Sequence, residues 1–139
     1  PTAAKESANP HGMADYKKAI DAVQAEQYEE AQALLEKAVS QNSEFTEAWY
    51  NLGATRGVLA VIAAHENNDS AALHYFREAV AAKRRAKDLM DQGKFVFYNK
   101  SQQDEVRSDV EHALEDADEV MGDERSLLIA LRITPIPRH

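Results

Sequence analysis

No proline occurs between Pro10 and Pro135, and this long uninterrupted stretch is the feature that most limits what the chain can fold into. Proline breaks a helix because it lacks a backbone N–H donor and its ring clashes with the preceding turn. Apolar residues within the stretch recur at spacings of three and four, as in Met13, Tyr16 and Ile20, which is the spacing of one helix face. The sequence therefore predicts an all-α protein, and 139 residues are enough for one domain with its own core.

The periodic segments predict a series of helices joined by short polar turns. The predicted helices cover residues 13–25, 26–39, 47–65, 70–90, 101–121 and 126–133. The residues expected to cap helix N-termini are Thr46, Asp69 or Ser70, and Ser101 with Asp104 three residues later. Gly93 is the expected stop of the fourth helix. The aromatic segment KFVFY at 94–98 has no second strand to pair with, and we interpret it as a hydrophobic anchor loop.

The two ends of the chain lack the helical pattern. Residues 1–12 are small and polar with two prolines, and we expect a disordered lead-in there. Residues 134–139 also contain two prolines, which predicts an extended tail. No apolar run reaches the roughly 20 residues that a membrane-spanning helix needs. The chain has no cysteine, hence no disulfide framework, thiol nucleophile or cysteine-ligated zinc. Cytoplasm and periplasm both fit, so the localisation stays open.

The net charge of −8 is concentrated in one segment. Residues 101–126 contain ten acidic and two basic side chains, whereas Lys83, Arg84, Arg85 and Lys87 form a basic cluster upstream. This basic cluster either pairs with the acidic helix of the same molecule or faces an acidic partner. Binding to nucleic acid is not expected, because phosphate contacts need a net basic surface.

Small and aromatic residues recur at fixed distances in the middle of the chain. The matching positions are Trp49, Leu52 and Gly53, then Ala72, Phe76 and Ala79, and in a preceding unit Ala31, Leu35 and Ala38. This pattern resembles the tetratricopeptide repeat (TPR) family, in which each repeat of about 34 residues is a pair of antiparallel helices. The resemblance implies TPR-like helix hairpins over residues 13–92, closed by C-terminal amphipathic helices over residues 93–133.

The second repeat departs from the family pattern in length. Ala31 and Ala72 are 41 residues apart rather than about 34, which implies a seven-residue insertion. Placed in the hairpin loop, the insertion lengthens each of the two helices by about one turn. Arg56 stands where the family has tyrosine, Ser43 where it has proline, and Asp15 occupies the tryptophan site of the first helix.

The segment EAWYNLG at 47–53 builds a shape rather than a reactive site. Two helices pack closely only where side chains are small, so Gly53 and Ala72 are expected at the contact within the second hairpin. Trp49 would fill the space beside them as part of the core, where truncation of a large aromatic side chain costs about 3–5 kcal/mol.

The resemblance implies a protein–protein interaction scaffold or adaptor that binds a peptide or helix in a TPR-type concave groove, without catalysis. The positions that the family's register places in this groove are Tyr16, Lys17, Ile20, Gln24, Tyr50, Asn51 and Ala54. One sub-type of the family clamps a partner's C-terminal carboxylate with lysine and asparagine. Asn51 matches one of those positions, but Tyr16 and Ile20 do not match the others, so that partner class is not expected.

Two alternative functions remain open. Asp109 and His112, followed by Glu115 and Glu119, resemble half of a helical-bundle metal site, but the sequence has no second carboxylate–histidine pair of this spacing. A metal- or small-ligand-binding bundle is one alternative, whereas the main expectation includes no metal, cofactor or catalytic residue. A self-assembling homo-oligomer is the other, because two repeats are fewer than the three or so that cover a repeat stack.

Overall fold

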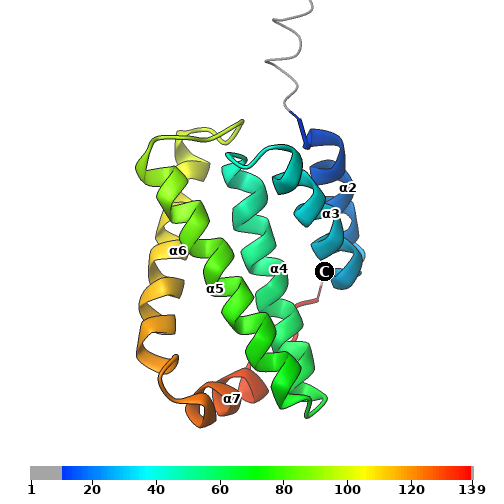
Figure 1. The fold of residues 1–139 in the computed structure, drawn as a ribbon, viewed down its shortest axis with the longest axis vertical. Coiled ribbons are helices and arrows are strands. Elements are labelled where there is room, and N and C mark those ends of the chain that lie inside the picture. The colour runs from blue at the N-terminus through cyan, green and yellow to red at the C-terminus, as the bar shows by residue number, and fades with distance from the viewer. Residues whose placement is uncertain (1–10, 139) are drawn as a thin grey trace, which may run out of the picture.

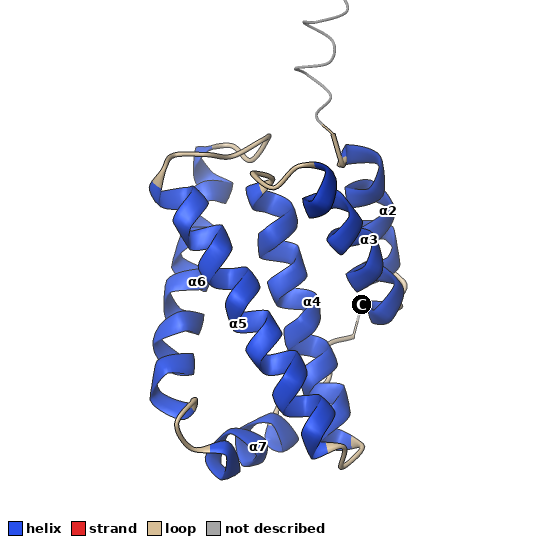
Figure 2. Ribbon diagram, viewed as in Figure 1, coloured by secondary structure: helices blue, strands red, loops and turns tan. Residues whose placement is uncertain are grey.

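The computed structural model describes residues 11–138, and within this range it contains six α-helices and no β-strand (Figures 1 and 2). The helices are α2 (Met13–Gln24), α3 (Tyr28–Gln41), α4 (Thr46–His65), α5 (Asp69–Asp91), α6 (Lys100–Val120) and α7 (Glu124–Ile133). The predicted all-α fold is confirmed. The predicted lead-in falls almost entirely outside the described residues.

Consecutive helices α2 to α6 pack side by side as antiparallel neighbours. α4 and α5 form the central and most extensive helix pair, with the α2–α3 hairpin against α4 and α6 against α5 (Figure 1). α7 crosses the far end of α4 and α5, and the chain after it runs back toward the α2–α3 hairpin (Figure 1). The segment 94–98 is a loop between α5 and α6, as expected, and Gly93 ends α5 with a φ of 73°.

The N-cap residues of α5 and α6 differ from the predicted ones. The N-cap of α5 is Asn68, whose side chain accepts a hydrogen bond from the Ala71 N–H at 3.2 Å. α6 begins with a capping box between Asn99 and Gln102. The predicted caps Asp69, Ser70 and Ser101 lie one to two residues too far along the chain. Runs such as Asn-Asn-Asp-Ser offer several side chains that can cap, and composition alone does not select among them.

The contact between α4 and α5 depends on the absence of a side chain at Gly53. A Cβ atom there would lie 2.7 Å from the Lys83 Cγ and 3.3 Å from the Ala79 carbonyl oxygen. Ala72 and Ala79, on the facing side of α5, are buried as expected. Trp49 is half-buried between two parts of the core, and its indole N–H donates to the Ser43 carbonyl at 2.9 Å.

Arg56, in place of the family's tyrosine, is a buried cation that joins three helices. Its guanidinium donates to the Gln32 side chain of α3 and to the Glu78 carbonyl of α5, and it forms an ion pair with Glu36 at 3.2 Å. A planar guanidinium with five donors can bridge several acceptors at once. Arg56 therefore links α4 to both α3 and α5 through polar contacts.

The second hairpin, α4–α5, is longer than the first, α2–α3. α7 and the tail cover the part of α4 and α5 that extends beyond the first hairpin. α4 and α5 have 20 and 23 residues, compared with 12 and 14 for α2 and α3, so they overhang by roughly 12 Å. The buried overhanging residues Ala60, Val61 and Ala64 pack against Leu127 of α7. Leu131 of α7 and Ile136 of the tail join the same cluster. The tail (residues 134–138) thus helps to close the end of the bundle.

Gly53→Leu should destabilise the protein by at least about 2 kcal/mol, because the added side chain must displace Lys83 or separate α4 from α5. Urea denaturation monitored by circular dichroism measures this change. Gly57→Leu is the matched control, since a Cβ there meets no atom of the described chain within 4 Å. The control should be neutral or slightly stabilising, because leucine favours helix more than glycine does. Equal effects at the two positions would contradict this packing.

Candidate functional site

One face of α4 receives contacts from α2, from α6, from the loop at 94–98 and from the tail. Positions 47, 54, 58 and 65 lie near one line along a helix of 3.6 residues per turn. α2 and α6 flank the N-terminal half of this face. The Asn51 amide donates to the Tyr16 hydroxyl of α2 at 3.1 Å, and the Tyr50 hydroxyl donates to Asp109 of α6 at 2.9 Å.

The seven residues predicted for the groove differ in accessibility. Tyr16 is buried, Ile20, Tyr50 and Asn51 are half-buried, and Lys17, Gln24 and Ala54 are exposed. The structure brings Tyr16 and Asn51 into contact, whereas Tyr50 is directed to α6. Lys17 and Gln24 make no side-chain hydrogen bond or ion pair within residues 11–138. Tyr16 is therefore part of the structural core of this face, and Ala54 is its open centre.

A buried carboxylate holds the anchor loop (residues 94–98) over the N-terminal end of the face. Glu47 has an exposed fraction of 0%. Its carboxylate accepts the backbone N–H groups of Val96 at 2.9 Å, Phe97 at 2.6 Å and Tyr98 at 2.9 Å. Three donors to one carboxylate satisfy a charge that would otherwise be costly to bury. The anchor loop is thus bound to α4 as a peptide would be bound, through its own backbone.

Aromatic rings reinforce this attachment. The Phe97 ring lies edge-on to Tyr16 at 5.5 Å and to Phe45 at 6.4 Å, and Tyr16 stacks on Phe45 at 5.0 Å. The Thr46 hydroxyl, expected to cap α4, instead donates to the Lys94 carbonyl at 2.6 Å. Phe97 nevertheless remains 48% exposed, so the anchor loop presents an aromatic edge to solvent beside the α4 face.

The tail covers the opposite end of the same face. The His65 Nε2 atom lies 2.7 Å from the Thr134 carbonyl oxygen, and the Tyr28 hydroxyl donates to the Pro137 carbonyl at 3.2 Å. Glu47 and His65 are about five helical turns apart, or roughly 27 Å. The open strip, defined as Ala54, Gly57 and Val58, lies between the two covered ends. Ala54 is exposed, and a Cβ at Gly57 would meet no described atom within 4 Å.

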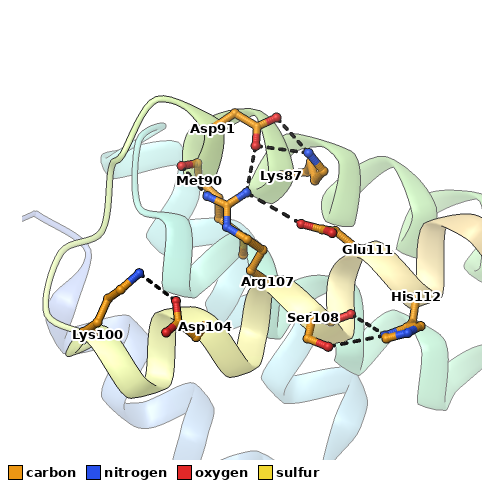
Figure 3. A network of polar contacts seen from close by, with 9 residues as sticks. All are labelled: Lys87, Met90, Asp91, Lys100, Asp104, Arg107, Ser108, Glu111 and His112. Atoms are coloured by element: carbon orange, nitrogen blue, oxygen red, sulfur yellow. Dashed lines mark hydrogen bonds and ion pairs between the residues drawn. The ribbon is translucent and has the colours of Figure 1, made fainter.

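Arg107 of the acidic helix α6 attaches this helix to the end of α5 (Figure 3). Arg107 donates to Asp91 at 2.9 Å and to the Met90 carbonyl at 2.8 Å, and Lys87 also pairs with Asp91. These contacts hold the pKa of the exposed Asp91 carboxyl below its ordinary value, through hydrogen bonds from Lys87 and then Arg107. The network fixes where the acidic helix lies relative to the α4 face.

The metal-like pattern on α6 does not converge on one point. The His112 Nδ1 atom lies 2.9 Å from the Ser108 carbonyl of the preceding turn (Figure 3), while Asp109 accepts a hydrogen bond from Tyr50. Within residues 11–138 no group of three or more histidine, aspartate or glutamate side chains is arranged to hold a metal ion.

The basic cluster splits between several acceptors. Arg84 pairs with Asp118 of α6 at 2.8 Å, as one of the two interpretations expected. Lys87 pairs within its own helix with Asp91, and Arg85 donates to the Ser43 carbonyl. Lys83 lies over Gly53, where burial lowers the pKa of its amine and the nearby Asp109 partly opposes that shift. The four cations thus contact α4, α5, α6 and the turn between α3 and α4.

No helix in the described part of the chain is both long and apolar enough to cross a bilayer. Comparisons of the chain with protein-family models, curated proteins and solved structures found no match. Any functional proposal therefore depends on the geometry above.

Glu47→Gln should destabilise the protein by about 1–3 kcal/mol, because an amide is a weaker acceptor and its NH₂ group would face backbone donors. Denaturant unfolding measures the loss, and hydrogen exchange should show faster exchange at the amides of Val96, Phe97 and Tyr98. Glu44→Gln, which removes only the exposed ion pair to Lys94, should cause a much smaller change. Unaltered exchange in the Glu47 variant would contradict the anchoring role.

The stability of the fold should fall as the pH rises above about 10, where tyrosine normally ionises. Burial raises the pKa of the Tyr16 and Tyr50 hydroxyls, and hydrogen bonds to Tyr98 and Asp109 respectively raise them further. The folded state therefore favours the protonated hydroxyls, and this preference becomes a loss of stability once the unfolded chain can ionise. Between pH 8 and 11, the free energy of unfolding, measured by denaturation, should fall less steeply with pH for Tyr50→Phe than for the parent protein. Identical slopes for the two proteins would contradict this coupling.

Proposed function

We propose that this chain is a protein-binding scaffold or adaptor that holds a helix or extended peptide along the open strip of α4, in the manner of a TPR groove. The observation that supports it is the exposure of Ala54 at the centre of a face whose two ends are covered by the chain's own anchor loop and tail. Small residues on an exposed helix face let a partner backbone approach closely.

The size of the open strip suits a short recognition element. The open strip itself, from Ala54 to Val58, covers about 6 Å of α4. The two residues that flank it, half-buried Asn51 and buried Val61, are about 15 Å apart along the helix, or roughly three turns. An extended peptide of about five residues has the same length. Tyr50 and Asn51, both half-buried, stand at one end of the strip, where the Tyr50 ring offers aromatic surface to a partner.

The polar groups around the strip favour binding over catalysis. The Asn51 amide is held between Tyr16 and the Glu47 carbonyl, and the Tyr50 hydroxyl is engaged by Asp109. These contacts fix the shape of the face before a partner arrives, which lowers the entropy lost on binding.

Self-assembly is the second candidate, and the outer side of α7 favours it. Ile129 and Ile133 follow each other by one turn and are 50% and 77% exposed. A second copy of the chain could bury this pair at the end of the bundle, where a further repeat would otherwise stack. Light scattering at several concentrations distinguishes this candidate from a monomeric adaptor.

Ala54→Arg should abolish or strongly weaken binding of a groove partner, because the long side chain would occupy the open strip. Ala33→Arg is the matched control, since Ala33 is an exposed alanine on α3. A photoreactive amino acid at position 54 or 33 first captures the partner for identification. Calorimetry with the purified partner then measures both arginine variants.

Tyr50→Ala should reduce the affinity for the same partner by about 1–3 kcal/mol, the range of an interface hot spot. Equal crosslinking at positions 54 and 33, or full binding by Ala54→Arg, would exclude the open strip as the binding surface. Loss of binding on charge reversal at Arg84 and Arg85, with the strip variants unaffected, would assign the function to the basic cluster instead.

A further inference from the structure

A concave surface lies where α4 runs past the end of the α2–α3 hairpin. We call it the turn depression, a hollow of about 450 Å³ lined by Glu26, Gln27, Tyr28, Glu29, Glu30, Leu59 and Ile62. The first five residues come from the α2–α3 turn and the start of α3, and the last two from the second half of α4. The hollow exists because the longer second hairpin overhangs the first.

The turn depression combines an apolar floor with an acidic rim. Leu59 and Tyr28 are buried side chains and Ile62 is half-buried, whereas Glu29 and Glu30 are exposed. The carboxylates of Glu29 and Glu30 form no hydrogen bond or ion pair with any residue between 11 and 138. Two adjacent carboxylates beside apolar surface favour a cationic, partly apolar ligand.

The chain's own tail lies beside the turn depression. An adjoining hollow of about 200 Å³ shares Glu26, Tyr28 and Ile62 with the turn depression and is otherwise lined by Ile136, Pro137 and Arg138. In this hollow the Tyr28 hydroxyl donates to the Pro137 carbonyl, and Ile136 packs into the apolar cluster of α4 and α7. Burial raises the pKa of the Tyr28 hydroxyl, the Glu26 carboxylate raises it further, and the Arg138 guanidinium opposes this shift. An extended, proline-containing segment with one aliphatic and one basic residue therefore borders the turn depression and packs against the Tyr28 that both hollows share.

We propose that the turn depression binds an extended basic segment of another polypeptide. An aliphatic side chain of that segment would cover Leu59 and Ile62, and flanking arginine or lysine residues would face Glu29 and Glu30. The surface is separate from the open strip, so this inference does not rest on the proposed scaffold function.

Fluorescence anisotropy with the full chain and a labelled peptide, Arg-Pro-Ile-Pro-Arg, tests the proposal. The parent protein should bind this probe, with an affinity that falls as salt is added. Replacement of both arginines of the probe by glutamate should abolish binding, and replacement of its isoleucine by glycine should weaken it. Equal binding of the isoleucine and glycine probes would overturn the role of the apolar floor, and no binding of the Arg-Pro-Ile-Pro-Arg probe would overturn the proposal as a whole.

Charge reversal on the protein locates the site. The double variant Glu29→Lys/Glu30→Lys should weaken probe binding by about tenfold, since each exposed pair contributes modestly. Asp116→Lys/Glu119→Lys changes the net charge equally on exposed positions of α6 and should leave binding within about twofold of the parent. If both double variants lose the same amount of affinity for the peptide, net charge alone explains the effect and the proposal is overturned. Ala54→Arg should bind the probe normally, whatever its effect on a groove partner.

Discussion

The buried carboxylate of Glu47 is the constraint on which one whole end of the molecule depends. A charge with no solvent contact has to be matched by donors, or the folded state loses several kcal/mol. Here the donors are three successive backbone N–H groups of the anchor loop, together with the position of Glu47 in the first turn of α4, where the helix dipole favours negative charge. Because the anchor loop leads directly into α6, the same contact determines where α6 begins and which of its faces meets α5.

The opposite end is governed by helix length rather than by charge. α4 and α5 extend beyond the first hairpin, and their apolar surface there has no helix of that hairpin to pack against. α7 and the tail supply the missing cover, with Leu127, Leu131 and Ile136 at the contact. Both ends of the α4 face are therefore closed by segments that follow α5 in the chain. The segments that follow α5 leave the open strip in the middle and the turn depression beside the tail uncovered.

The sequence was sufficient for the features that depend on local patterns. Helix periodicity gave all six helices of the described chain, and the small residue at Gly53 marked a close helix contact that the structure contains. The anchor loop was also recognised, because an isolated KFVFY segment has no strand partner. The sequence defines the predicted groove residues only as positions along helices. It does not reveal that Phe45 and Phe97, which are distant in sequence, bury Tyr16.

Features that depend on distant contacts were not predictable in the same way. Glu47 looks like an ordinary first-turn acid, and nothing local reveals that donors 49 to 51 residues away will surround it. Arg56 looks like a defect in the repeat pattern, yet its acceptors on α3 and α5 make it a buried bridge. The caps at Asn68 and Asn99 were missed for a different reason, because neighbouring polar residues compete for the same role.

The small size of the two proposed sites limits how tightly a partner would bind at either one alone. A contact along about 15 Å of helix buries less area than a standard stable interface. The turn depression, a hollow of about 450 Å³, is also small compared with such an interface. Affinity at such sites comes from preorganisation, which the Tyr16–Asn51 and Tyr50–Asp109 hydrogen bonds already provide. A partner carrying both a short helix and a basic extension would gain further, because binding at one site raises the effective concentration at the other. Such a partner would be recognised by the spacing between its two elements as much as by the sequence of either.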